Sequence, residues 1–170
     1  MRREAERIDG VTVMGTRQGA FPAYRGGRPF GGLMVLALFL LTISAQLGLA
    51  DVRTIELQIG EQRLTAEVAD TEATRRHGLM FREHLPANHG MLFIWDRPAR
   101  YAMWMQNTPL PLSVAFIDAD GRIVNIEDMQ PHTQNPHQAR TPVIYALEME
   151  QGWFNTRGIR PGDRVSGLPE

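Results

Sequence analysis

The segment MWMQNTP places an aromatic side chain and several polar groups at the end of a predicted strand. Neighbouring strand residues point to opposite faces, so Met103 and Met105 share one side and Trp104 points to the other. An aromatic face beside the polar side chains of Asn107 and Thr108 suits the rim of a pocket for a sugar or another small polar molecule. The alternative is structural: the methionines fill gaps in the core, Trp104 packs on a second layer, and Asn107 and Thr108 end the strand with local hydrogen bonds.

Basic side chains gather around a short predicted helix at residues 72–77. Arg75 and Arg82 could flank one cleft and bind an anionic group, and Arg82 could instead pair with a carboxylate such as Glu148. The structural alternative is that Arg75, Arg76 and their neighbours interact favourably with the partial negative charge at the end of the helix. Both interpretations remain open from the sequence.

Two histidines, His132 and His137, share one proline-rich loop and are weak candidates for metal ligands. A zinc site needs three or four ligands, and the sequence brings only Asp128 forward as a third. The thioethers beside Trp104 would suit copper(I) outside the cell, a further minor alternative. The motif DADG lacks the later ligands of a calcium loop and predicts a turn. The sequence therefore predicts no bound cofactor.

The sequence contains no complete catalytic motif. After residue 50 the serines are Ser113 and Ser166, and neither lies in a Gly-x-Ser-x-Gly elbow. Glu148 and Glu150 would share one face of a strand, but an exposed strand edge explains them equally well. The prediction leans away from an enzyme.

Charge and composition exclude some classes of function. Residues 51–170 hold 12 Arg and 16 Asp and Glu, a net charge of −4, and no Lys. Nucleic-acid binding needs clustered positive charge to neutralise phosphates, so it is not expected here. The chain has no Cys, which excludes disulfides and thiolate–metal chemistry.

The first 50 residues have the three parts of a secretory signal. Residues 1–32 are rich in Arg and Gly, residues 33–43 (LMVLALFLLTI) form an apolar run, and small residues follow up to Ala50. A spanning helix needs about 20 apolar residues, so cleavage after Ala50 is preferred and an uncleaved inner-membrane anchor at residues 33–50 is the alternative. The basic region is long, so translation could begin at Met1 or Met14. We expect a periplasmic or secreted domain, residues 51–170, with no stable membrane span after cleavage.

Alternating apolar residues predict strands through most of this domain. RTIELQI and RLTAEV form one predicted hairpin around Gly60, and VAFID and RIVNI form another around the Asp120–Gly121 turn. MLFIW, YAMWM and VIYALEM predict further strands. TPLPL predicts an edge or loop because proline lacks an amide donor, and a long proline-rich loop follows at residues 130–142. The segment 72–77 predicts a short helix capped by Asp70 or Thr71, and residues 151–157 predict another. The expected fold is mainly β, a compact antiparallel sandwich or barrel-like domain with one or two short helices.

Several motifs occur in the order that is typical of one family: GLMFREHL, GMLFIW, MWMQNTPLPL, FIDADGRIVNI, and YALEM followed by GIRPGD. From about Val68 to Val165 the chain resembles the domain of unknown function 192 family. The resemblance implies a compact β-rich fold, frequent export and no established activity. Two positions depart from the family: Gln106 stands where Lys is frequent, and Ser113 where Asp is frequent.

Three hypotheses follow for the exported domain. The preferred one is a non-enzymatic ligand-binding or accessory module, acting as a monomer on a small polar molecule or carbohydrate. Its expected ligand-binding residues are Arg75, Arg82, Trp104, Asn107, Thr108 and Glu148. The alternatives are an envelope hydrolase or metal-dependent enzyme using His132 and His137, and a structural partner of another envelope protein.

Overall fold

The computed structural model describes residues 52–169. The predicted signal peptide, its cleavage after Ala50 and the alternative membrane anchor fall outside these residues and stay predictions. Within residues 52–169, no helix is both long and apolar enough to cross a membrane.

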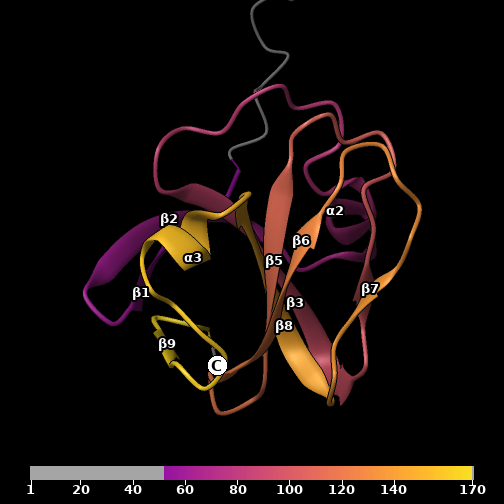
Figure 1. Ribbon diagram of the computed structural model, residues 1–170. Coiled ribbons are helices and arrows are strands. Elements are labelled where there is room, and N and C mark those ends of the chain that lie inside the picture. Colours follow the sequence, from indigo (N-terminus) through magenta and orange to yellow (C-terminus); the bar gives the residue numbers. More distant parts are fainter. Residues whose placement is uncertain (1–51, 170) are drawn as a thin grey trace, which may run out of the picture. The chain divides into compact units, whose positions relative to one another are not determined.

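Most of the described chain forms one curled sheet, drawn in Figure 1. The sheet has seven strands in the order β6-β5-β8-β3-β2-β1-β9, and a separate two-stranded sheet pairs β4 with β7. The strands are β1 (Thr54–Ile59), β2 (Gln62–Ala69), β3 (His89–Ala99), β4 (Ala102–Met103), β5 (Leu112–Ile117), β6 (Ile123–Met129), β7 (His137–Gln138), β8 (Val143–Glu150) and β9 (Val165–Ser166). The helices are α2 (Glu72–His77) and α3 (Trp153–Thr156).

Both predicted hairpins are present. In the first, β1 pairs with β2 so that Ile59 lies opposite Gln62 around the Gly60 turn. In the second, β5 pairs with β6, and Gly121 has the positive φ of 76° that its turn requires. The segment YAMWM forms only the two-residue strand β4, which pairs with β7 rather than joining the large sheet.

One pairing in the large sheet is parallel. β2 and β3 run in the same direction, with Thr65 opposite His89 and Ala69 opposite Phe93, while the other pairings of this sheet are antiparallel. Parallel neighbours need a crossover connection. Residues 70–88, which include α2, supply it, so the crossover carries the helix to one face of the sheet.

The two edges of the sheet meet at one end. Arg122, just before β6, bridges to Arg164, just before β9. The Val165 amide donates to the Gly121 carbonyl at 2.8 Å, and the Ile123 amide donates to the Asp163 carbonyl at 2.9 Å. These bonds hold the curl that Figure 1 shows. The mainly β, barrel-like architecture with two short helices is confirmed.

Each face of the sheet carries its own hydrophobic cluster, because strand residues alternate between the faces. One cluster includes Leu92 and Leu147 and is completed by Trp153 and Phe154 of α3. The other occupies the opposite face and includes Met103 of the small β4-β7 sheet together with residues of the loops. Its buried members are Ala69, Leu79, Met91, Phe93, Met103, Met105, Leu112, Val114, Phe116, Met129, Ala139, Val143 and Ala146. This second face carries the candidate site.

Candidate functional site

Strand β8 lies inside the sheet, between β5 and β3. Glu148 of this strand is opposite Met91 of β3 and Val114 of β5, both of which belong to the second hydrophobic cluster. Its side chain is only 4% exposed. An exposed strand edge, one of the explanations for Glu148 from the sequence, is therefore wrong: the carboxyl group lies within an apolar face.

Helix α2 forms one wall of the site. Thr71 is its N-cap: the Thr74 amide donates to Thr71 Oγ1 at 3.1 Å, and the Thr71 amide donates to Thr74 Oγ1 at 3.0 Å. The helix buries none of its own residues. Arg75 ties it to the sheet, because Arg75 Nη1 donates to the Ile94 carbonyl at 2.7 Å and to the Asp70 carbonyl. The short helix thus depends on docking to keep its position.

The opposite wall comes from residues 102–108. Met103 and Met105 point into the core, while Trp104 is 53% exposed, which confirms the predicted alternation. Asn107 adopts a positive φ of 55°, and its carbonyl accepts a 2.8 Å hydrogen bond from the amide of Phe81, which itself has a φ of 64°. This bond connects the segment after α2 to the segment after β4.

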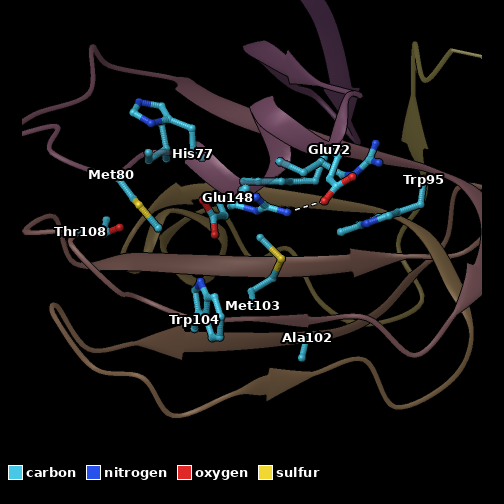
Figure 2. Close-up of a pocket in the computed structure, with 14 residues that line it drawn as sticks. Glu72, His77, Met80, Trp95, Ala102, Met103, Trp104, Thr108 and Glu148 are labelled. Atoms are coloured by element: carbon cyan, nitrogen blue, oxygen red, sulfur yellow. Dashed lines mark hydrogen bonds and ion pairs between the residues drawn. The ribbon is translucent and has the colours of Figure 1, made fainter.

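Between these walls lies a cleft of about 250 Å³. Glu148 lies near the middle of the residues drawn in Figure 2, with Met103 and Trp104 on one side and Glu72 and His77 on the other. The cleft is lined by Glu72, Arg75, Arg76, His77, Gly78, Leu79, Met80, Phe93, Trp95, Ala102, Met103, Trp104, Thr108 and Glu148. Seven of these residues carry aromatic, aliphatic or thioether groups and six are polar or charged. Of the six, only Thr108 and Glu148 are buried.

Burial raises the pKa of the Glu148 carboxyl from 4.5 to about 8. Among residues 52–169 no hydrogen bond or ion pair reaches this carboxylate, and desolvation is the cause of the shift. Among the described residues, every side-chain oxygen that is fully buried has a hydrogen-bond partner. The Glu148 oxygens have none, so they are not fully buried. The Glu148 oxygens therefore reach the cleft, and at neutral pH the group is mainly a protonated acid.

The two arginines of the cleft already have partners. Arg76 forms an ion pair with Glu72 on the exposed side of α2, marked in Figure 2. Arg75 holds the main chain at Asp70 and Ile94. His77 points away from Glu148, and its ring centroid lies 6.3 Å from that of Phe81. The predicted placement of Arg75 beside the cleft is thus correct, with a structural role in addition.

Arg82 lies elsewhere. It forms two parallel hydrogen bonds of 2.6 Å to the carboxylate oxygens of Glu67 on β2. The predicted pairing of Arg82 with Glu148 is wrong, and Arg82 is not among the residues that line the cleft. Glu67 is partly buried on β2, close in space to the segment after α2, which sequence spacing alone did not reveal.

The other predicted site residues divide into two groups. Trp104 and Thr108 line the cleft together with Glu148, as expected. Thr108 is 4% exposed, and its hydroxyl donates to the Gln106 carbonyl at 3.2 Å. Asn107 is exposed and does not line the cleft; its positive φ makes it a turn residue. Whether any of these residues binds a ligand stays a prediction.

The two loop histidines do not form a recognisable metal site. His132 is exposed with a φ of 60°, and its amide donates to the Thr108 carbonyl at 3.1 Å. His137 belongs to β7. Across residues 52–169, His, Asp and Glu side chains nowhere gather in threes in a way that could hold a metal ion. Of the two thioethers considered for copper(I), Met103 lines the cleft and Met105 does not.

Gln106 and Ser113, the two departures from the family pattern, do not line the cleft. Ser113 is buried on the first face of β5, where its hydroxyl donates to Asp128 Oδ1 at 2.5 Å and accepts from the Gly152 amide at 2.9 Å. Ser113 thus connects β5, β6 and the start of α3. These hydrogen bonds occupy the hydroxyl in structural contacts.

Sequence reasoning missed several residues of the cleft, among them Met80, Phe93 and Trp95. Trp95 stacks on Tyr101 with ring centroids 4.0 Å apart and on Phe93 at 6.3 Å, which makes a continuous aromatic wall. For Phe93 and Trp95, the strand pattern of β3 predicts only that they belong to the core. Only the parallel crossover, which brings α2 over β3, reveals that they border an open space.

Solved structures with the same fold were found. A crystal structure described as a candidate transcription regulator from Sinorhizobium meliloti 1021 is 36% identical, with a TM-score of 0.68, and the match covers 71% of this chain and 98% of that one. A protein of unknown function from Novosphingobium aromaticivorans DSM 12444 is 32% identical, with a TM-score of 0.65, over 69% of this chain and 88% of that one. No curated protein matches. Residues 55–167 match the family DUF192, described as Uncharacterized ACR. The chain therefore belongs to the domain of unknown function 192 family.

Proposed function

We propose that this protein is an exported module that binds a small polar molecule in the cleft between α2 and residues 102–108. The observation that carries the proposal is Glu148: a carboxyl group that is 4% exposed, lacks a partner among the described residues and reaches a cleft of about 250 Å³. Burying a polar group without a partner costs free energy. Such a group in a cleft, with a strongly shifted pKa, is a marker of a functional site.

The composition of the cleft supports binding of a compact molecule. Ligand sites are mostly apolar with a few placed polar groups. Here Trp104 and Trp95 supply aromatic surface, while Glu148 and Thr108 supply polar contacts. The net charge of −4 for residues 51–170 favours a small molecule over nucleic acid, so the regulator description of the Sinorhizobium protein is not extended to this chain.

Export is part of the proposal and rests on the N-terminal sequence. The basic segment, the apolar run 33–43 and the small residues up to Ala50 support secretion with cleavage before Asp51. Mass spectrometry of the protein from the periplasmic fraction tests this step. A mature N-terminus at Asp51 is expected, and an intact N-terminus in the cytosolic fraction would contradict it.

A thermal-unfolding screen of the full-length chain tests ligand binding. Sugars, small amines, alcohols and carboxylates are the probes, and selective binding raises the midpoint of unfolding. We expect at least one probe to stabilise the wild type and to lose that effect in Trp104→Ala and Glu148→Gln. If no probe stabilises the protein in a way that depends on these two residues, the proposed site is wrong.

The raised pKa of Glu148 also favours a second candidate function, general acid catalysis on a bound molecule, because an acid is most useful when its pKa is near the working pH. Incubation of a stabilising probe with the protein separates the two. A binding module returns the probe unchanged in an NMR spectrum, whereas an enzyme converts it and loses that conversion in Glu148→Gln.

A further inference from the structure

The chemical class of the ligand can be inferred from the groups that the cleft presents, an inference that rests on the proposed function. We propose that the cleft binds a small aromatic or aliphatic amine, with its ammonium group on the Glu148 carboxylate and its carbon skeleton against Trp104 and Met103. The geometry behind this assignment is a buried carboxyl at the base of a cleft whose walls are aromatic and thioether groups.

The first argument is the lack of a counter-charge. A buried carboxylate is stable only when it is paired and hydrogen-bonded. Within the described chain, the two arginines of the cleft are used elsewhere: Arg76 pairs with Glu72, and Arg75 donates to main-chain carbonyls. The third basic residue, His77, points away from Glu148. An ammonium ligand would supply the missing positive charge and up to three donors.

The second argument is Thr108, the other polar group placed in the buried part of the cleft. Its hydroxyl proton is donated to the Gln106 carbonyl, so toward a ligand in the cleft the hydroxyl oxygen can act only as an acceptor. The ionised Glu148 carboxylate is an acceptor as well. Two acceptors match an N–H donor, whereas a carboxylate or phosphate ligand would need donors in these positions.

The third argument is the aromatic lining of the cleft. Trp104 is 53% exposed and lines the cleft, and Trp95 and Phe93 continue the aromatic lining. A cation within about 6 Å of an indole face is attracted by the ring quadrupole. A volume of about 250 Å³ corresponds to roughly eight water molecules, which suits a molecule of the size of phenethylamine.

The assignment has a pH signature. The free carboxyl is protonated below a pKa of about 8 and must ionise to bind an ammonium group, so binding releases a proton and affinity rises with pH up to about 8. The other charged or titratable groups of the cleft are Glu72, Arg75, Arg76 and His77, all from α2. The residues opposite Glu148 on the flanking strands are Met91 of β3 and Val114 of β5, and neither side chain titrates. The variant His77→Gln measures the contribution of that imidazole separately.

Isothermal titration of the full-length chain with three probes of similar shape tests the inference. These are phenethylamine, the neutral 2-phenylethanol and the anionic phenylacetate. We expect phenethylamine to bind at least tenfold more tightly than either of the others at pH 8, and to weaken by tenfold or more at pH 6 in both wild type and His77→Gln. Glu148→Gln is expected to lose at least tenfold of the affinity for the amine, while Glu150→Gln, on the same strand but exposed, retains it.

Two results would overturn the amine assignment. One is tighter binding of phenylacetate or 2-phenylethanol than of the amine, lost in Glu148→Gln, which would leave the cleft as a binding site for a different class. The other is no binding of phenethylamine at any pH. The proposed function itself fails only if the wider thermal screen also finds no ligand that depends on Trp104 and Glu148, so the two failures are distinguishable.

Discussion

Glu148 and Glu150 point to the same face of strand β8, yet the first is buried and the second is exposed. Glu148 is flanked by Met91 on one side and Val114 on the other, whereas Glu150 lies at the end of the strand, opposite Leu112. The difference in burial has a direct consequence for the two carboxyl groups. Desolvation raises the pKa of Glu148 to about 8 and makes folding stability depend on pH.

Glu148→Gln should remove a pH dependence from the free energy of unfolding. Below pH 4.5 the carboxyl is protonated in both the folded and the unfolded chain, so it has no effect on stability. Between pH 4.5 and about 8 the unfolded chain loses this proton and the folded chain keeps it, so stability falls by roughly 1 kcal/mol per pH unit. Denaturant unfolding at pH 5, 6.5 and 8 measures this slope.

We expect the Gln variant to match the wild type near pH 4.5. At pH 8 it should be more stable by several kcal/mol, on the order of the unfolding free energy that the wild type loses between these two pH values. Glu150→Gln is the control, since that side chain is exposed, and it should unfold like the wild type. A constant difference between Glu148→Gln and the wild type across this pH range would contradict a buried, unpartnered carboxyl.

Gly90→Ala should destabilise the sheet beneath the cleft. A Cβ at Gly90 would lie 2.2 Å from the Glu148 carbonyl oxygen and 2.3 Å from Met149 Sδ, far inside van der Waals contact. Overpacking of this kind costs about 3 kcal/mol or more, measurable by denaturant unfolding. Gly60→Ala is the control, because nothing lies within 4 Å of its added Cβ and only its φ of 57° opposes the change, a cost of about 1 kcal/mol. Equal losses in the two variants would contradict the close packing at Gly90.

Arg82→Ala should lower stability without changing ligand binding. The variant breaks both hydrogen bonds to Glu67 and leaves a carboxylate that is 18% exposed without its partner, at a cost of about 1 kcal/mol. Arg76→Ala, which breaks an exposed pair with Glu72, should cost less. A ligand affinity that falls in Arg82→Ala while the protein stays folded would place Arg82 in the site after all.

Phe81→Asn should reduce the conformational strain at this position. Phe81 is 69% exposed and has a φ of 64°, a conformation that bulky side chains rarely adopt and Asn tolerates. Phe81→Ala removes the ring but keeps the unfavourable conformation, so it isolates the effect of the backbone. We expect the Asn variant to exceed the Ala variant by about 0.5–1 kcal/mol in unfolding free energy. Equal stability would mean that the loop relaxes to another conformation.

The fold was largely predictable because its signals are local. Alternation in RTIELQI and RLTAEV and the Asp120–Gly121 turn determine the hairpins, and Thr71 and Gly78 bound the short helix. The parallel pairing of β2 with β3 was not predictable in this way. It depends on how a connection of some 19 residues packs back onto the sheet, which no residue within either strand encodes.

The candidate site was predictable only in part for the same reason. Trp104 and Thr108 lie four positions apart in one recognisable motif, and strand alternation correctly separated Trp104 from Met103. Glu148 looks like any surface glutamate in the pattern VIYALEM until β8 is known to be a central strand. Arg82 does not line the cleft, because it pairs with Glu67, which comes close only through the crossover that carries α2.

A carbon-13 NMR titration of the Glu148 side-chain carboxyl tests the central claim most directly, with the signal assigned by its absence in Glu148→Gln. A group buried in the sheet without a partner should titrate with a midpoint near pH 8, while Glu150 serves as the exposed reference on the same strand. A midpoint for Glu148 near its ordinary value of 4.5 would show that the carboxyl is solvated or paired, and the proposed binding site would lose its basis.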